Sequence, residues 1–171
     1  MKRIVLLAIA AIAFAASSVA QKYALIDMEY ILKNIPSYEM ANEQLNQVSQ
    51  RWQKECDDKA AEAKTMYQNY QSDLVFLTEE MKVKREEEIR DKETEVVELR
   101  RKYFGPEGEL FKKRESLMKP IQDDIYNAIK KISEEKGYSM VIDRASSPNI
   151  IFASPKIDIS NEVLAKLGYS K

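Results

Sequence analysis

The chain has 171 residues with 27 basic and 28 acidic side chains, so its formal net charge is only −1 at pH 7. This balance gives no electrostatic reason to expect a nucleic acid as partner. With one cysteine and no histidine, the sequence excludes an internal disulfide, histidine-dependent catalysis and the commonest metal ligand. The four glycines form no phosphate-binding loop, and the high charge content favours long solvated helices. We therefore expect no enzymatic activity, no cofactor and no metal.

The first twenty residues are expected to be a secretory signal peptide. Lys2 and Arg3 form a short basic start, and residues 4–16 are all apolar. Ser18 and Ala20 then place small residues at the positions that signal peptidases read. An uncleaved membrane anchor is the alternative, but it needs about 20 apolar residues. The sequence therefore predicts export and cleavage after Ala20.

The mature chain is expected to open with a short strand and a short helix. Residues 23–26 form a compact apolar run that is typical of a buried strand. Asp27 stands where a helix N-cap is expected, ahead of a helix over residues 28–34. Pro36 interrupts that helix and begins the next one.

Residues 37–135 are predicted to be almost entirely helical, because apolar side chains recur there at steps of three and four. In the outward part these positions are Tyr38, Ala41, Leu45, Val48, Trp52, Cys56, Ala60, Ala63, Tyr67, Tyr70, Leu74 and Leu77. In the returning part they are Val96, Leu99, Tyr103, Leu110, Leu117, Ile121, Ile125, Ile129 and Ile132. A pattern sustained over this length predicts a seam for a partner helix. Cys56 is expected to be a small apolar residue of this seam rather than a reactive thiol.

Two places are candidates for the turn between two antiparallel helical arms. Gly105, Pro106 and Gly108 form the strongest helix breaker, but a turn there leaves much of the seam unpaired. A turn near residues 77–79 pairs the seam over most of its length. We therefore assign residues 37–118 to a helical hairpin arm with its turn at 77–79. Gly105, Pro106 and Gly108 then form a kink or hinge in the returning arm.

The last part of the chain is expected to be a small β-containing region. Gly137 is a plausible helix stop, and a strand over residues 138–142 is followed by a turn over 145–149. Residues 150–153 then form a second strand, and a final helix covers residues 161–167. We assign residues 21–36 and 119–171 to one body in which the two ends of the chain meet. Asp143 and Asp158 are interpreted as turn and capping residues rather than metal ligands.

The order of these pieces resembles the Skp/OmpH family of periplasmic chaperones. The resemblance is carried by residues 23–28 with their short helix, the long charged hairpin, residues 137–143, and residues 158–164. It implies a mainly α fold, with a helical hairpin arm that projects from a β-stranded trimerisation body. It also implies a homotrimer that holds unfolded outer-membrane proteins in a cavity between its arms, without ATP. The alternative from the residues alone is a structural coiled-coil scaffold or spacer of the cell envelope.

Two groups of arm residues are candidates for contact with partners. The apolar group near the turn carries more bulk than one seam can hide, and exposed apolar patches usually mark contact sites. It comprises Tyr67, Tyr70, Leu74, Val75, Phe76, Leu77 and Met81. Its alternative role is to lock the two helices together, above all for Tyr70, Leu74 and Leu77, which are in register with the seam. Within the family, basic arm residues are linked with lipopolysaccharide or membrane-surface binding. Lys82, Lys84, Arg85 and Arg90 are the matching positions, and the alternative for them is a solvated helix face.

Overall fold

The computed structural model describes residues 21–169, so the predicted signal peptide lies outside the described residues. Long helices and one small sheet make up the described chain, which confirms the mainly α fold class. The residues cluster into two compact units, and the first is Ile35–Asp123. The second unit comprises the described residues on either side of that range. We call the first the hairpin unit and the second the body unit.

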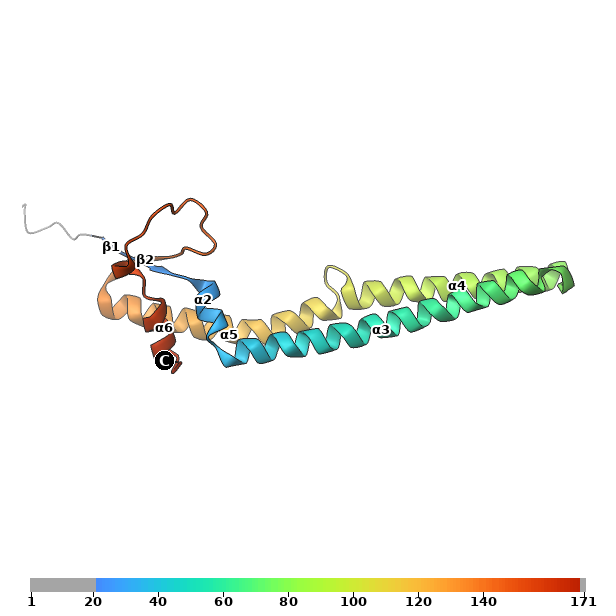
Figure 1. Ribbon diagram of the computed structural model, residues 1–171, viewed down its shortest axis with the longest axis horizontal. Coiled ribbons are helices and arrows are strands. Elements are labelled where there is room, and N and C mark those ends of the chain that lie inside the picture. The colour runs from blue at the N-terminus through green and yellow to red at the C-terminus, as the bar shows by residue number, and fades with distance from the viewer. Residues whose placement is uncertain (1–20, 170–171) are drawn as a thin grey trace, which may run out of the picture. The chain divides into compact units, whose positions relative to one another are not determined.

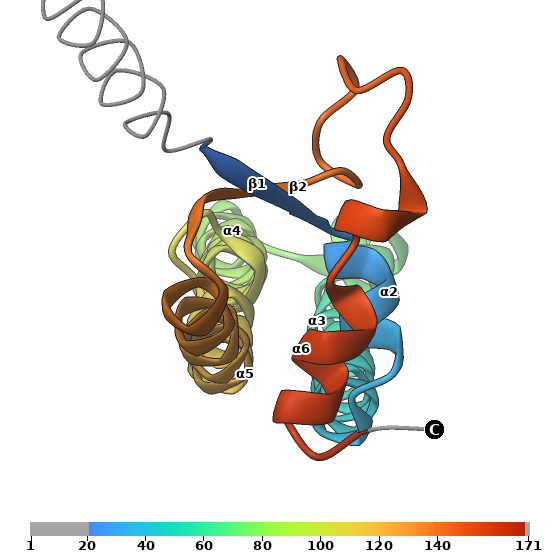
Figure 2. The same cartoon turned by 90° about the vertical axis from the view of Figure 1, so that its left-hand side faces the viewer.

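The body unit contains two parallel strands, β1 over Lys22–Ile26 and β2 over Tyr138–Asp143. Ala24 pairs with Val141, and Leu25 pairs with Ile142. In Figure 2 the two strands lie side by side, and the short helices α2, Met28–Lys33, and α6, Ser160–Lys166, lie next to each other. Ala24, Leu25 and Ile26 are buried, so β1 contributes to the core of this unit.

The expected strand over residues 150–153 is wrong, because these residues belong to no strand of the structure. The edge of β1 away from β2 is occupied by a bridge from Leu25 to Asp158, beside the 3-10 turn η2 at Pro155–Ile157. Residues 150–153 therefore have no neighbouring strand within the body unit, and an extended segment cannot form a ladder without one. As a result Ile151 is 99% exposed and Phe152 is 85% exposed.

Capping residues join the pieces of the body unit as the sequence predicts. Asp27 caps α2, Met28–Lys33, by accepting a hydrogen bond from the backbone nitrogen of Tyr30 at 2.8 Å. Asp143 accepts hydrogen bonds from the backbone nitrogens of Met28 and Ala145, each at 3.0 Å. Burial raises the pKa of Asp143, but these hydrogen bonds outweigh burial, so its pKa is lowered overall.

The last helix, α6, spans Ser160–Lys166, and hydrogen bonds hold its start near the carboxyl end of β1. Asp158 accepts hydrogen bonds from the backbone nitrogen and the hydroxyl of Ser160, and that hydroxyl oxygen accepts one from the backbone nitrogen of Asp27. Arg144 adds ion pairs to Asp27 at 3.0 Å and to Asp158 at 3.7 Å. The predicted turn roles of Asp143 and Asp158 are thus confirmed, whereas the N-cap residue of α6 is Ile159 and has no side-chain cap.

The hairpin unit is built on α3, Pro36–Asp73, and α4, Glu79–Phe104, which lie side by side in Figure 1. The chain reverses between them through the 3-10 turn η1, Leu74–Phe76. Thr78 then caps α4, its hydroxyl oxygen accepting a hydrogen bond from the backbone nitrogen of Met81 at 3.3 Å. Ion pairs join Glu62 to Lys92 and Asp57 to Arg100, so the two helices run antiparallel.

The seam between α3 and α4 is narrow. Its buried side chains recur every seven residues on each helix, and they are Cys56, Ala63 and Tyr70 on α3 and Ile89, Val96 and Tyr103 on α4. The predicted seam position of Cys56 is confirmed, because this thiol is fully buried. A seven-residue repeat of buried positions is the pattern of a coiled-coil pair.

The returning chain is broken at residues 105–108, between α4 and α5, Glu109–Lys136. The backbone nitrogen of Gly105 donates to the carbonyl oxygen of Arg101, which completes the last turn of α4. The backbone nitrogen of Gly108 donates to the carbonyl oxygen of Gly105 before α5 begins. Gly137, at a φ of +70°, follows the last residue of α5 and confirms the predicted helix stop.

Candidate functional site

An exposed apolar surface lies at the turn of the hairpin. Val75 and Phe76 belong to the 3-10 turn η1 and are each 83% exposed. Their neighbours in sequence, Leu74 and Leu77, are partly buried, while Tyr67 and Met81 are exposed on α3 and α4. We call these six residues the tip surface. Val and Phe side chains with this exposure add little to the packing of the hairpin, so the tip surface is a candidate contact site.

Tyr70 was predicted with this group, but the structure places it inside the seam. Its side chain is buried, and its hydroxyl donates a hydrogen bond to Glu86 on α4. This hydrogen bond, reinforced by burial, raises the pKa of Tyr70 to about 12. Tyr70 therefore links the two helices just below the turn, and we leave it out of the tip surface.

The four basic residues singled out on α4 are not equivalent. Lys82 forms an ion pair with Glu79 at 2.7 Å, and Arg85 forms one with Glu88 at 3.4 Å, both within the same helix. No carboxylate of the described residues forms an ion pair with Lys84 or Arg90. Lys84 and Arg90 are thus the two positions of this group at which an added anion would displace no existing partner.

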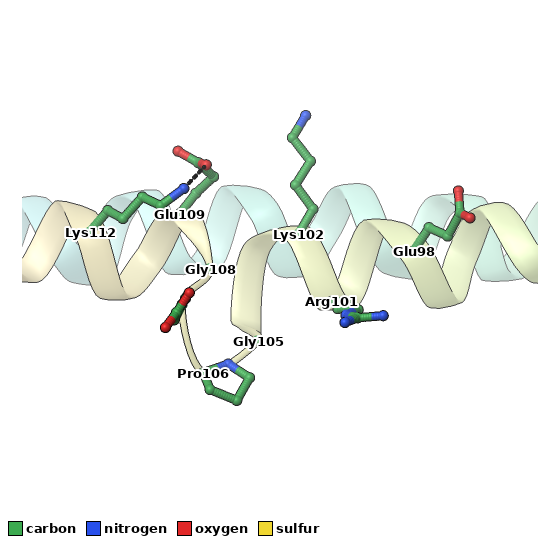
Figure 3. Close-up of a pocket in the computed structure, with 9 residues that line it drawn as sticks. Glu98, Arg101, Lys102, Gly105, Pro106, Gly108, Glu109 and Lys112 are labelled. Atoms are coloured by element: carbon green, nitrogen blue, oxygen red, sulfur yellow. Dashed lines mark hydrogen bonds and ion pairs between the residues drawn. The ribbon is translucent and has the colours of Figure 1, made fainter.

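A pocket of about 570 Å³ lies at the helix break and contains the predicted hinge residues Gly105, Pro106 and Gly108. Figure 3 shows the break from the side, with the ion pair between Glu109 and Lys112 at 3.2 Å. The other charged side chains that line the pocket are Glu98, Arg101, Lys102 and Glu107. Since both signs of charge surround it, the pocket offers no clear preference for an anionic or a cationic ligand.

The titratable groups of the described residues give no sign of acid–base catalysis. Hydrogen bonds to carboxylates raise the pKa of Lys92 and of Tyr103, and the hydrogen bond from Lys92 lowers the pKa of Glu62. Each shift stabilises the protonation state that the group already has at neutral pH. A catalytic acid or base needs a pKa that is shifted toward neutral pH instead. Within residues 21–169, no group of His, Cys, Asp or Glu has the arrangement of a metal site. No helix in this range is both long and apolar enough to span a bilayer.

The sequence analysis missed a second exposed apolar segment, in the body unit. Ile151 and Phe152 follow Pro148 and Asn149 in the connection between β2 and η2, and both side chains are almost fully in solvent. Met140 on β2 is also exposed. The signal was present as four consecutive apolar residues, 150–153, but it was interpreted as a paired strand rather than as a surface.

The sequence matches the outer membrane protein (OmpH-like) family over residues 22–167, which is most of its length. The chain belongs to the OmpH-like family. It is similar to chaperone protein Skp of Vibrio cholerae, with 26% identity over 157 residues that cover 87% of this chain and 85% of that protein. The family is that of the Skp/OmpH chaperones, which are periplasmic and are not a class of enzyme.

A solved structure supports the same fold. The crystal structure of an OmpH-like chain from Caulobacter crescentus CB15 superposes with a TM-score of 0.70. The match covers 88% of this chain and 86% of that one, at 10% sequence identity. At this identity the likeness concerns the fold, which is therefore that of OmpH-like chains. The resemblance drawn from the sequence is confirmed at the level of the family.

Proposed function

We propose that this protein is an ATP-independent holdase of the periplasm that binds unfolded outer-membrane proteins and prevents their aggregation. The observation that carries the proposal is the tip surface, where Val75 and Phe76 lie in solvent within a chain of the OmpH-like family. Many weak apolar contacts give avidity while leaving the bound chain mobile. The charged flanks of α3 and α4 keep such a surface soluble. The similar protein from Vibrio cholerae is itself named a chaperone.

The decisive experiment is light scattering of a denatured outer-membrane barrel diluted into buffer with and without this protein. The wild-type protein should suppress aggregation without nucleotide, and Val75→Ser with Phe76→Ser should suppress it less. A matched control replaces Val83 and Val97, which are also exposed but lie along α4, by serine. Helicity and assembly should be the same in all three proteins. Equal suppression by the tip variant and the wild type would overturn the tip assignment. Absence of suppression by the wild type would favour the envelope spacer instead.

We propose in addition that three copies assemble through the body unit, so that their hairpins enclose a shared cavity for the client. Two features of the body support this assembly. Ile151 and Phe152 are exposed, and β2 has a strand partner on one side only among the described residues. A mass measurement on the pure protein tests the three-fold assembly. A monomer at micromolar concentration would rule it out.

Lipopolysaccharide or another anionic membrane surface is a further proposed partner, with Lys84 and Arg90 as its contacts. Since exposed charges are screened by salt, binding through them should weaken as salt is added. Binding that is unaffected by salt would exclude this site. We also propose that residues 1–20 direct export and are removed after Ala20, which mass analysis of the protein recovered from the periplasm would check.

A further inference from the structure

Four charged side chains join α3 and α4 at one level of the hairpin. The amine of Lys92 lies 2.9 Å from a carboxylate oxygen of Glu62 and 2.8 Å from one of Glu95. The amine of Lys59 lies 3.4 Å from Glu62 and 3.5 Å from Glu95. Each amine thus contacts both carboxylates, and the four groups form a closed ring of alternating charge. Two sides of the ring lie within a helix and two cross the seam.

The ring is better shielded than an ordinary surface ion pair. The side chain of Lys92 is 20% exposed and that of Lys59 is 32% exposed, while the two carboxylates are about half exposed. Isolated surface pairs contribute little, but networks in which one side chain is held by several partners contribute more. Among the ion pairs of the described residues, the one other link between α3 and α4 joins Asp57 to Arg100 at 3.8 Å.

The hairpin is packed differently on the two sides of this ring. Toward the helix break, the rings of Trp52 and Tyr103 stack at 4.7 Å with an interplanar angle of 5°, and the Tyr103 hydroxyl donates to Glu55 at 2.9 Å. Toward the turn, the buried seam side chains are Ala63, Tyr70 and Ile89, and no stacked aromatic pair joins the helices there among the described residues. The first side therefore has aromatic stacking in addition to its buried seam, and the second side has the buried seam without it.

We infer that Lys59, Glu62, Lys92 and Glu95 form an ionic clasp between α3 and α4, through which ionic strength sets how readily the tip half of the hairpin, residues 66–88, opens. Segments with few buried contacts open locally at a low free-energy cost. Between the clasp and the turn, Ala63 and Ile89 are buried and the Tyr70 hydroxyl donates to Glu86, so the clasp is the last link between α3 and α4 that salt can screen as an ion pair among the described residues. Salt screens the clasp but leaves the stacked aromatic rings in place. This inference does not depend on client binding.

Hydrogen exchange of backbone amides tests the clasp on the full-length mature protein. The comparison is made at about 20 mM and about 500 mM sodium chloride, where screening lengths are roughly 20 and 4 Å. High salt should speed exchange in residues 66–88 by about fivefold, which is the size expected for a partly shielded network. Amides around Trp52 and Tyr103 should exchange at the same rate in both. Equal exchange of residues 66–88 at both salt concentrations overturns the clasp.

Charge swaps separate the clasp from a general effect of salt. Swapping the charges on α4 alone, Lys92→Glu with Glu95→Lys, keeps the net charge and the pair within the helix but places like charges across the seam. In this variant the amides of residues 66–88 should exchange faster than in the wild type, most strongly at low salt. Added salt should therefore slow their exchange, whereas it speeds exchange in the wild type. Adding Lys59→Glu and Glu62→Lys rebuilds an alternating ring and should restore wild-type exchange.

The matched control swaps Lys54→Glu and Asp58→Lys, an exposed pair 2.6 Å apart that lies within α3 only. It should exchange as the wild type does. The inference would be overturned if residues 66–88 exchanged at the wild-type rate in the α4 swap. It would also be overturned if the four-residue swap did not restore the wild-type rate. If a swapped variant fails to fold, the salt response of the wild-type protein alone decides the matter.

Discussion

Single residues of the hairpin combine packing with a polar link to the opposite helix. Tyr70 fills a seam position and donates its hydroxyl hydrogen to Glu86, and Tyr103 does the same with Glu55. A tyrosine suits this arrangement because its ring is apolar and its hydroxyl reaches the edge of the seam. Each such bond also fixes the axial position of one helix against the other, which a narrow apolar seam does only weakly.

Tyr70 makes the hairpin sensitive to alkaline pH. Its pKa rises from 10 in the unfolded chain to about 12 in the folded chain, because the neutral hydroxyl donates to Glu86. The resulting stability is fully present below pH 10 and is lost as the pH rises toward 12. Thermal unfolding followed by circular dichroism should therefore shift downward in this interval for the wild type. The Tyr70→Phe variant should have a lower midpoint than the wild type below pH 10, and its midpoint should fall less between pH 10 and pH 12. Identical pH profiles would contradict the role of this hydroxyl.

Cys56 should be chemically quiet despite being the sole cysteine of the chain. It is fully buried in the seam, and burial raises the pKa of its thiol, so the reactive thiolate is rare and shielded. Reaction with a thiol reagent at pH 8 should be about 100-fold slower in the folded protein than in denaturant, since it requires local opening. Equal rates would mean that the seam is open at this level.

At the scale of elements, the sequence showed the local signals and the pairing of the two arms, but it did not show the partner of each strand or the register between helices. Asp27, Pro36 and Gly137 act through their own backbone or that of near neighbours, so the sequence predicted their caps and stops correctly. The strand at residues 150–153 failed because a strand needs a partner. The partner of β2 is β1, more than a hundred residues away in the sequence. The clasp was missed for the same reason, since its cross-helix pairs depend on the register between α3 and α4.

The break between α4 and α5 depends on a glycine at position 108. A Cβ atom there would lie 2.8 Å from the carbonyl oxygen of Tyr103 and 2.9 Å from that of Lys102, so the backbone would have to move. Gly108→Ala should lower the free energy of unfolding by about 1–3 kcal/mol, the usual cost of forcing atoms into occupied space. Urea unfolding measures this loss, with Glu107→Ala in the same loop as the control. Equal stability of Gly108→Ala and the wild type would show that the loop adjusts freely, as the predicted hinge requires.

At the scale of the whole molecule, the body unit has an apolar core but leaves other apolar side chains in solvent. Its sheet has two strands, and the apolar side chains of Ile151 and Phe152 remain in solvent. Small units bury a smaller share of their surface than large domains do, and are therefore marginally stable as single chains. The contact surfaces proposed for client and for assembly could be located from the sequence only as apolar runs. Which of them is exposed was decided by pairing across the fold, as the contrast between buried Tyr70 and exposed Phe76 shows.

Folding and assembly should therefore be coupled through the body unit. If three copies associate, dilution favours the separated chains, and each separated chain loses the burial of Ile151 and Phe152. The midpoint of thermal unfolding should fall as the protein is diluted over a hundredfold range, with helicity lost in the same transition. The variant with Ile151→Ser and Phe152→Ser should have a lower assembled mass and a lower unfolding temperature than the wild type. The variant with Val75→Ser and Phe76→Ser should keep the assembled mass and the unfolding temperature of the wild type. A midpoint that does not depend on concentration, together with a folded monomer, would show that the body is stable without partners.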